Sequence, residues 1–326
     1  MSSPLVSVCM PASRPSAMFD EALSSVLAQT LGDFEVVVTD DSGGSLRATI
    51  EDVNDPRVRY HANAQRLGLS GNHCNAIDSA RGRFVAILHD DDAWLPTYLE
   101  TAADVLQRGP QVGLCISASV DVAADGTILR RKPNAMVSGV QRDPLSHLLD
   151  PRFPVMHPSA TVWRRDALDS NHRPWADLVV ADMTAFIDPV LAGWQVHYSA
   201  VPLVRYRVHD GQIGATQQCR HRDGLVKLWS GYRFADSRHE QLRRQLLARW
   251  HIARAGALLR SGRVDAASMD IASAAREDSS VQPLRRTALR ALCSAPWLID
   301  PSRHALDSAR RLTAAAGTRR SHAHST

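Results

Sequence analysis

Three consecutive aspartates, Asp90, Asp91 and Asp92, directly follow an apolar run at residues 84–88. Like charges held side by side raise one another's pKa, and a divalent cation offsets their repulsion. Carboxylate oxygens suit Mg²⁺ or Mn²⁺, and Mg²⁺ typically combines one or two carboxylates with substrate phosphates. The triplet therefore predicts a metal site for a ligand that carries a diphosphate. A solvated turn or a helix N-cap is the alternative interpretation.

The elements around this triplet alternate between strand and helix. Apolar runs at 5–10, 34–39, 57–61 and 84–88 predict strands, and helices are expected between them at 20–29, 45–52 and 70–80. This order favours a mostly parallel α/β sheet with helices on both faces. Polar residues follow three of the strands, at 11–14, 40–42 and 90–92. Ligands of open α/β sheets bind outside the carboxyl ends of the strands, so these residues are expected to meet at one site.

The rest of the chain predicts a second group of strands followed by helices. We expect a helix at 95–108, a strand at 112–118 with a hairpin turn at Asp125-Gly126, a helix at 176–193, and strands at 196–201 and 203–208. Beyond about residue 220 the pattern is helical, with a helix pair over 241–275 that breaks at 261–263.

Four stretches in order along residues 5–215 resemble glycosyltransferase family 2: VSVCMPASRP (6–15), DFEVVVTDDSG (33–43), NAQRLGLSGNHCNAIDSARGRFVAILHDDDAWLPTYLE (63–100) and ADMTAFIDPVLAGWQVHYSAVPLVRYRVH (181–209). The resemblance implies a Rossmann-like GT-A domain at 1–215, with a nucleotide-binding half at 1–118 and an acceptor half at 119–215. Residues 216–326 would form a helical extension with a basic tail. The implied activity is inverting transfer of a sugar from a nucleotide-sugar donor, most often a UDP-sugar, to a saccharide or lipid-linked acceptor.

The resemblance also implies donor-binding residues. Asp41 would accept a hydrogen bond from the base, with helix capping as the alternative, and Asp90 would hold the ribose side. Gly68 is expected to face the donor or to be a turn glycine. The other donor-binding residues implied by the resemblance are Pro11, Ala12, Ser13, Arg66 and Asn72.

The resemblance further implies a metal site and a catalytic base. Asp91, with Asp92, would bind Mn²⁺ or Mg²⁺, although His89 stands where the family's Asp-x-Asp-Asp pattern begins, which leaves open which carboxylate faces the metal. His209 would contact the diphosphate or the metal, or be structural. Asp182 matches the base that removes the acceptor proton, although Ala181 replaces the usual preceding Glu. A helix N-terminal acid is the alternative for Asp182.

Two further sets of residues are candidates for the base and for contact with the diphosphate. Asp188 competes with Asp182 as the base. Arg205 and Arg207, which alternate on the strand expected at 203–208, are expected to supply positive charge to the diphosphate.

Composition restricts location and partners. No apolar run approaches the roughly 20 residues of a membrane span, and no signal peptide is evident, so we expect a cytoplasmic protein. The five cysteines are scattered, which favours reduced thiols. The net charge is +4, yet residues 281–326 hold eight Arg against two Asp, or +6, so the other 280 residues carry −2. This basic tail predicts peripheral contact with anionic membrane, without a nucleic-acid partner; a solvated surface is the alternative.

Two other functions fit part of these observations. A nucleotidyltransferase also uses a parallel sheet, a metal and acidic residues, although residues 10–13 lack the Gly-rich loop it would typically show. A non-catalytic nucleotide-sugar or glycan-binding module would account for Ala181 and for the shifted acidic triplet.

Overall fold

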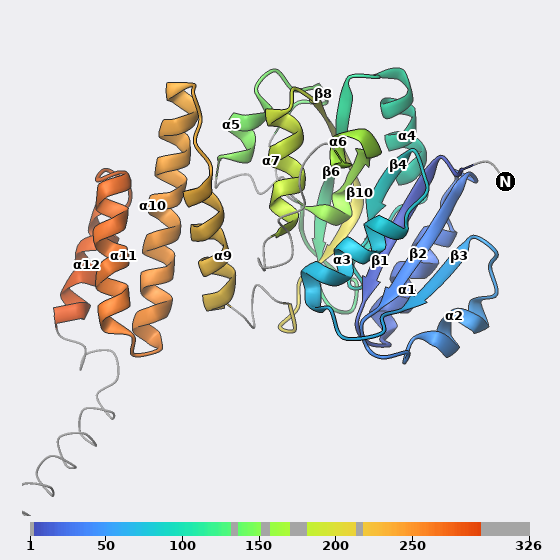
Figure 1. Cartoon of the computed structure of the whole chain (residues 1–326), viewed down its shortest axis with the longest axis horizontal. Helices are drawn as coiled ribbons and strands as arrows, with labels where there is room; N and C mark the ends of the chain where they lie inside the picture. The colour runs from blue at the N-terminus through green and yellow to red at the C-terminus, as the bar shows by residue number, and fades with distance from the viewer. Residues whose placement is uncertain (1–2, 132–135, 151–156, 170–180, 213–217, 295–326) are drawn as a thin grey trace, which may run out of the picture. The chain divides into compact units, whose positions relative to one another are not determined.

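The computed structural model describes residues 3–131, 136–150, 157–169, 181–212 and 218–294. The chain divides into two compact units, Met1–Thr216 and Gln217–Thr326. The first unit is α/β and the second is helical (Figure 1).

The first half of the α/β unit is a parallel sheet with its apolar strands buried. Strands β1 and β2 are completely buried, and most of their residues are apolar. Of their polar residues, Ser7 donates from its hydroxyl to Glu35 Oε1 at 2.6 Å. The side chain of Ser16 caps the first helix by accepting a hydrogen bond from the Phe19 N–H at 3.0 Å. The elements are β1 (Val6–Ala12), α1 (Ala17–Leu27), β2 (Phe34–Asp40), α2 (Arg47–Val53), β3 (Val58–Ala62), α3 (Gly68–Ser79) and β4 (Phe84–Ile87).

Pro11 lies inside β1, although we expected it to end the strand. The carbonyl of Cys9 accepts from the Leu88 N–H, and β1 pairs with β4 only as far as Cys9 and Ile87. The backbone nitrogen of Pro11, two residues after Cys9, faces the same side of β1, but β4 has already ended there. The missing N–H of proline therefore costs no ladder bond there.

The second half of the unit makes the sheet mixed. The strand order is β3-β2-β1-β4-β9-β6-β10-β5, with β7 paired to β6 and β8 paired to β10. Strand β9 is antiparallel to both β4 and β6, and β10 is parallel to β6. The strands are β5 (Ala93–Trp94), β6 (Val112–Val122), β7 (Ile128–Arg131), β8 (Gly139–Val140), β9 (Thr161–Arg164) and β10 (Gln195–Arg207).

This topology brings four chain segments to one edge of the sheet. Strand β9 is antiparallel to both of its neighbours, β4 and β6, and β10 is parallel to β6, so β4, β6 and β10 all run in the same direction. Their carboxyl ends therefore lie at the same edge as the start of β9. That edge therefore receives the acidic triplet after β4, the residues after β6 and β10, and the segment that leads into β9.

Two expected elements differ from those observed. The strands expected at 196–201 and 203–208 form one strand, β10, whose pairing with β6 has register shifts around Pro202. The helix expected at 176–193 is a 3₁₀-helix, η3 (Ala181–Met183), followed by α7 (Thr184–Leu191), while residues 176–180 lie outside the described residues. The remaining helices of this unit are α4 (Tyr98–Arg108), α5 (Pro144–Leu148), η1 (Pro158–Ala160) and α6 (Arg165–Asp169).

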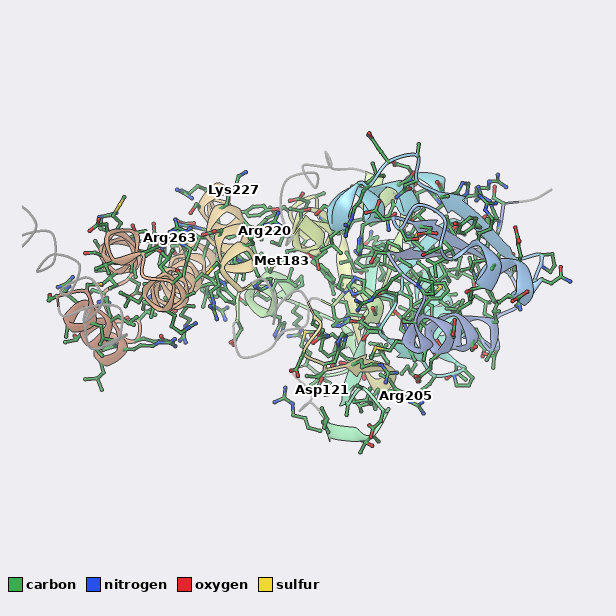
Figure 2. All side chains as sticks on the ribbon, turned by 90° about the horizontal axis from the view of Figure 1, so that it is seen from below. Asp121, Met183, Arg205, Arg220, Lys227 and Arg263 are labelled. Carbon is green, nitrogen blue, oxygen red and sulfur yellow. The ribbon has the colours of Figure 1, made fainter. Side chains whose placement is uncertain are left out.

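The second unit consists of helices α9 (Gln218–Gly231), α10 (Ser237–Arg260), α11 (Val264–Glu277) and α12 (Pro283–Ser294). Figure 2 shows them nearly end on, with Arg220 and Lys227 on α9 and Arg263 at the turn between α10 and α11. Gly262 has a φ of +76°, which allows the tight turn there. Leu258 and Ile271 belong to the apolar core between these two helices. None of the described helices combines the length and apolarity that crossing a bilayer requires.

Candidate active site

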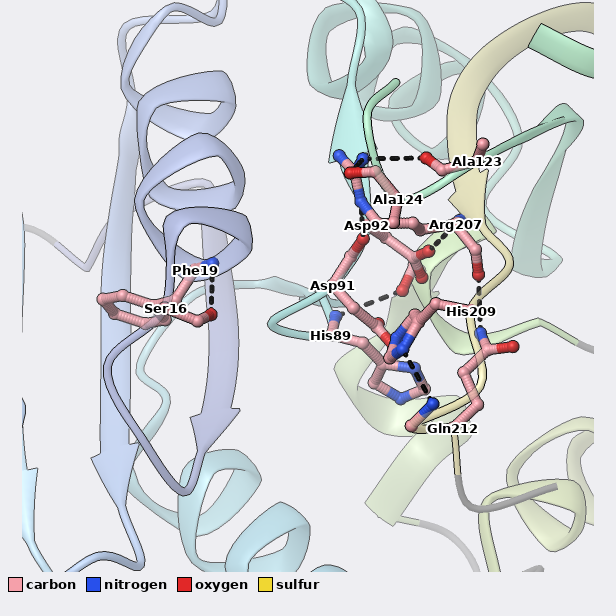
Figure 3. A network of polar contacts seen from close by, with 12 residues as sticks. Ser16, Phe19, His89, Asp91, Asp92, Ala123, Ala124, Arg207, His209 and Gln212 are labelled. Carbon is pink, nitrogen blue, oxygen red and sulfur yellow. Dashed lines mark hydrogen bonds and ion pairs between the residues drawn. The ribbon is translucent and has the colours of Figure 1, made fainter. Parts of the chain in front are cut away.

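The acidic triplet lies in a turn that is held from both sides. The His89 N–H donates to Ser159 Oγ at 3.1 Å, from the segment before β9. On the other side, the Arg207 N–H at the end of β10 donates to Asp92 Oδ1 at 2.9 Å. Figure 3 shows Asp91 and Asp92 beside Arg207 and His209. The segment before β9 and the end of β10 thus fix the position of the turn after β4.

His89, Asp91 and Asp92 can each direct one ligand atom to a common point. Their ligand atoms all lie within 4.8 Å of one another. The other carboxylate oxygen of Asp92, Oδ2, is buried and has no hydrogen-bond partner among the described residues. A buried oxygen without a donor is costly unless a cation or another donor satisfies it. Two carboxylates and one imidazole form a donor set that fits Mn²⁺ or Mg²⁺.

The pKa values of Asp90 and Asp92 are raised because these carboxyl groups are buried close to Asp91. Burial and the neighbouring Asp91 raise the pKa of Asp92 to about 7. Burial, and then Asp91, also raise the pKa of Asp90. Charging these groups is therefore unfavourable in the protein alone, and a bound cation would reverse that preference.

His209 is linked to the turn through Asp91. Its Nε2 lies 3.1 Å from Asp91 Oδ2, and its Nδ1 accepts from the Gly211 N–H at 3.2 Å. A neutral imidazole that accepts at Nδ1 carries its proton on Nε2, so in this arrangement His209 donates to Asp91. Metal ligation by His209, which would require that proton to leave, stays a prediction.

Three histidines and a tyrosine lie beside the turn, and their rings contact one another although they are far apart in the sequence. The His73 and His89 rings meet edge to face with centroids 5.2 Å apart, and the His89 and His157 rings are 6.0 Å apart. His157 meets Tyr206 edge to face at 4.2 Å, and its Nε2 lies 3.7 Å from Asp92 Oδ2. The sequence reasoning assigned none of these rings to the site.

His73 has a defined protonation state. Burial, together with His89, lowers its pKa to about 3, so the ring is neutral. Its Nδ1 lies 2.8 Å from the Leu69 carbonyl oxygen, which can only accept, so Nδ1 carries the proton and Nε2 has a lone pair. His73 is therefore an acceptor that packs against His89.

Asp182 lies in η3, just before α7, and is half-buried. Burial raises the pKa of its carboxyl group, and the interaction with His89 partly offsets this shift. An interaction of this kind requires proximity, so Asp182 and the acidic turn share the environment of His89. Asp188, the competing candidate, is also half-buried and lies farther along α7.

The residues predicted to bind the donor form a second polar cluster at the ends of β1 and β2. Asp41 accepts from Asn63 Nδ2 at 2.9 Å, from the Leu67 N–H at 2.7 Å and from the Gly68 N–H at 2.8 Å. Asn72 donates to the carbonyls of Ala12 and Thr39, each at 3.1 Å. The carboxylate of Asp41 thus orders the loop that begins α3, and its contact with a base stays a prediction.

The other donor-binding predictions differ in exposure. Pro11 and Ala12 are buried, whereas Ser13 and Arg66 are exposed. Gly68 has a φ of +72°, so it provides the left-handed turn into α3. Its contribution to donor binding stays a prediction, as do those of the other four residues.

The prediction that Arg207 supplies charge to a diphosphate is wrong. Its side chain is 1% exposed, and its guanidinium donates to the carbonyls of Asp91, Ala123 and Ala124 and to Glu21. All of these acceptors belong to the protein, so this guanidinium connects the turns after β4 and β6 instead. Arg205 is exposed (Figure 2).

Comparison with known proteins identifies the family. The sequence pattern of the family described as "Glycosyl transferase family 2" matches residues 7–171, half of the chain. The chain belongs to glycosyltransferase family 2. This glycosyltransferase is therefore a transferase enzyme, and the alternatives of a nucleotidyltransferase and a non-catalytic module are set aside.

Curated relatives match part of this glycosyltransferase. It is 35% identical over 105 residues to the Escherichia coli UDP-Glc:alpha-D-GlcNAc-diphosphoundecaprenol beta-1,3-glucosyltransferase WfgD, covering 32% of this chain and 42% of the relative. It is 31% identical over 110 residues to the Campylobacter jejuni GalNAc(5)-diNAcBac-PP-undecaprenol beta-1,3-glucosyltransferase, covering 32% of this chain and 36% of the relative. The chain thus spans less than half the length of these relatives.

Solved structures share the GT-A fold over nearly the whole chain. S. aureus TarS 1–349 in complex with UDP-GlcNAc has a TM-score of 0.66 at 17% identity and covers 94% of this chain and 91% of its own. The mannosyltransferase PcManGT from Pyrobaculum calidifontis, in complex with GDP-Man and Mn²⁺, has a TM-score of 0.56 at 20% identity, covering 97% and 86%. The expected α/β fold with C-terminal helices is confirmed.

Proposed function

We propose that this enzyme transfers a sugar, with inversion, from a UDP-sugar to a lipid-linked or polysaccharide acceptor, and that Asp182 is its catalytic base. The observation that carries this proposal is the shared environment of His89, which joins the half-buried Asp182 to a turn whose three ligand atoms lie within 4.8 Å. A base and a diphosphate site at one sheet edge are what a single displacement requires.

Asp182 is suited to remove a proton from an acceptor hydroxyl. Burial raises its pKa toward the working pH, which strengthens it as a base while it is ionised. As the acceptor oxygen bonds to the anomeric carbon, the bond from that carbon to the diphosphate breaks, and the hydroxyl proton passes to the Asp182 carboxylate. One attack from the face opposite the leaving group inverts the configuration.

His89, Asp91 and Asp92 would hold the divalent cation, with Mn²⁺ or Mg²⁺ as the fitting ions. A cation bound there supplies the positive charge that stabilises the departing nucleoside diphosphate. Arg207 and Ser159 keep the turn in place through its backbone, and Asp41 with Asn72 orders the neighbouring loop. We assign the nucleoside to this second cluster, with Asp90 toward the ribose.

The proposed donor and acceptor follow the relatives. TarS holds UDP-GlcNAc in its structure, and the two glucosyltransferases act, by their names, on undecaprenol-linked acceptors. An acceptor of this kind is embedded in a membrane, so we place the enzyme in the cytoplasm with peripheral contact to anionic lipid. The part of the basic tail beyond residue 294 lies outside the described residues.

A screen of donor hydrolysis over UDP-, GDP- and dTDP-sugars, with and without Mn²⁺, tests this function. We expect metal-dependent release of UDP from one UDP-sugar and its loss in Asp182→Asn when an acceptor is present. Proton NMR of the product should show the anomeric configuration opposite to that of the donor. Retention of configuration, or equal turnover with EDTA, would contradict the proposal.

A further inference from the structure

The C-terminal unit holds a large excess of positive charge. Residues 217–294 contain fifteen Lys and Arg against seven Asp and Glu, a net charge of +8. Several of these arginines are paired within the unit: Arg254 binds Asp270 and Asp223, and Arg243 binds Glu240. Asp223, Glu240 and Asp270 are therefore already paired with these two arginines.

Three arginines from three different helices converge, and none of them has such a partner among the described residues. Arg222 lies on α9, Arg260 at the end of α10 and Arg285 near the start of α12. Arg260 Nη1 and Arg285 Nη2 lie 3.8 Å and 4.0 Å from the point where a Gly256 side chain would begin. Both guanidinium groups therefore lie beside the same turn of α10.

Arg222 belongs to the same cluster. Burial lowers its pKa, and Arg260 lowers it further. Cys219 partly offsets this shift, and Arg285 adds a weaker lowering, so the charges of both arginines act on Arg222. Its Nη1 is buried and has no hydrogen-bond partner among the described residues. None of the three arginines forms an ion pair within the described part of the chain.

Such an arrangement is unfavourable in the absence of a ligand. Like charges repel, and a buried donor without an acceptor is unfavourable, more so when it is charged. An anion between the three side chains would satisfy both deficits. Guanidinium groups match the geometry of phosphate oxygens and remain charged at any physiological pH.

We propose that the cluster of Arg222, Arg260 and Arg285 binds a phosphate group. This site lies in the helical unit and does not depend on the proposed donor site. The phosphate belongs to an anionic lipid or to a soluble phosphate ester. Leu284, beside Arg285, is 86% exposed, so the surface next to the cluster also offers an apolar side chain to a lipid.

Thermal unfolding of the full chain in inorganic phosphate, at an ionic strength matched with KCl, tests the site. We expect saturating phosphate to raise the Tm of the wild type by about 2–4 °C. Arg222→Gln and Arg260→Gln should lose this increase, while Arg249→Gln, which changes an exposed arginine of α10 outside the cluster, should keep it. Without phosphate, the Tm of Arg222→Gln should be unchanged or higher because repulsion is removed.

A merely structural Arg222 would instead lower the Tm of the phosphate-free variant. The proposal is overturned if phosphate does not stabilise the wild type, or if it stabilises both cluster variants to the same extent. Stabilisation by UDP with Mn²⁺, measured on the same variants, separates this site from the donor site.

Sedimentation with phosphatidylcholine vesicles, with and without phosphatidylglycerol, identifies the source of the phosphate. Binding to the anionic vesicles that both cluster variants lose supports a lipid headgroup. Phosphate-dependent stabilisation of the wild type without vesicle binding supports a soluble phosphate ester.

Discussion

Asp92 Oδ1 accepts a 2.9 Å hydrogen bond from the backbone N–H of Arg207, while Oδ2 of the same carboxylate is buried without a hydrogen-bond partner in the described part of the chain. One oxygen thus fixes the side chain, while the other faces the His157 ring, whose Nε2 lies 3.7 Å away. An oxygen held in this way is prepared to ligate a cation, because little side-chain freedom is left to lose on binding. The first prediction concerns the acids at this turn.

Asp91→Asn should reduce kcat/KM by on the order of 10²–10³-fold, because the turn loses one of its two acidic ligands. Steady-state kinetics over a Mn²⁺ titration measures this loss. Asp104→Asn is the matched control, since Asp104 is half-exposed on α4 and pairs only with Arg108 among the ion pairs of the described residues. Equal activity of both variants would remove Asp91 from the mechanism.

Asp182→Asn should lower kcat by about 10²–10⁴-fold and leave the KM for the donor nearly unchanged, because a base acts on the acceptor proton and not on donor binding. Asp188→Asn is the comparison, since it removes the competing carboxylate on α7. A large loss of kcat in Asp188→Asn alone would transfer the role of base to that residue.

His89→Asn should raise the Mn²⁺ concentration for half-maximal activity by about 10–100-fold, because the cation loses a ligand. His73→Gln should produce a smaller increase in the same direction, since the neutral ring of His73 packs against His89 and orients it. His61→Asn changes a half-buried histidine of β3 outside the turn and should leave the titration unchanged. A normal titration of the His89 variant would contradict the assigned ligand set.

The stability of the metal-free protein should depend on the pH through Asp92. Its pKa in the folded protein is raised from 3.8 to about 7, so the folded state holds the proton more tightly than the unfolded chain does. The free energy of unfolding therefore falls as the pH rises from about 4 to about 7. Thermal unfolding in EDTA should show a weaker fall for Asp92→Asn, with no difference between the slopes below about pH 4.

Protons and the cation compete for the same carboxylate. The Mn²⁺ concentration for half-maximal activity of the wild type should consequently decrease as the pH rises from 6 to 8. A titration that is independent of pH over this range would show that Asp92 is already ionised throughout.

Arg207→Met should lower the free energy of unfolding by about 3–5 kcal/mol, because three carbonyl groups and Glu21 lose their donor at a buried position. Urea unfolding measures the loss. Arg108→Met, at an arginine whose side chain is 81% exposed, should cost less than about 1 kcal/mol. A similar cost for both variants would mean that the turns after β4 and β6 do not depend on this guanidinium.

Local sequence patterns predicted the parallel strands and the helix pair of the C-terminal unit, because β1, β2 and β4 are mostly apolar and the helix pair turns at Gly262. They did not predict β9, since it is only four residues long and β-forming residues can pair in either direction. The order of the strands is a long-range property that no short window contains.

The acidic turn was predicted from its charge density, and His209 was predicted beside it, whereas three further histidines were not. His73, His89 and His157 lie on three separate segments, and only the sheet brings them together. For His89, the available signal was its position directly before Asp90 at the end of an apolar strand. For Arg207, the alternation of arginines on β10 gave no indication that one of them is buried.

Strand β9 has a consequence for the position of the acidic turn. A reversed strand presents the segment that enters it, rather than the one that leaves it, to the carboxyl edge, and here that segment supplies Ser159 and His157 to the acidic turn. A change of length or composition before β9 would therefore reach the acidic turn directly, even if β1 to β4 remained intact. This half of the sheet thus couples a connecting segment to the position of Asp92.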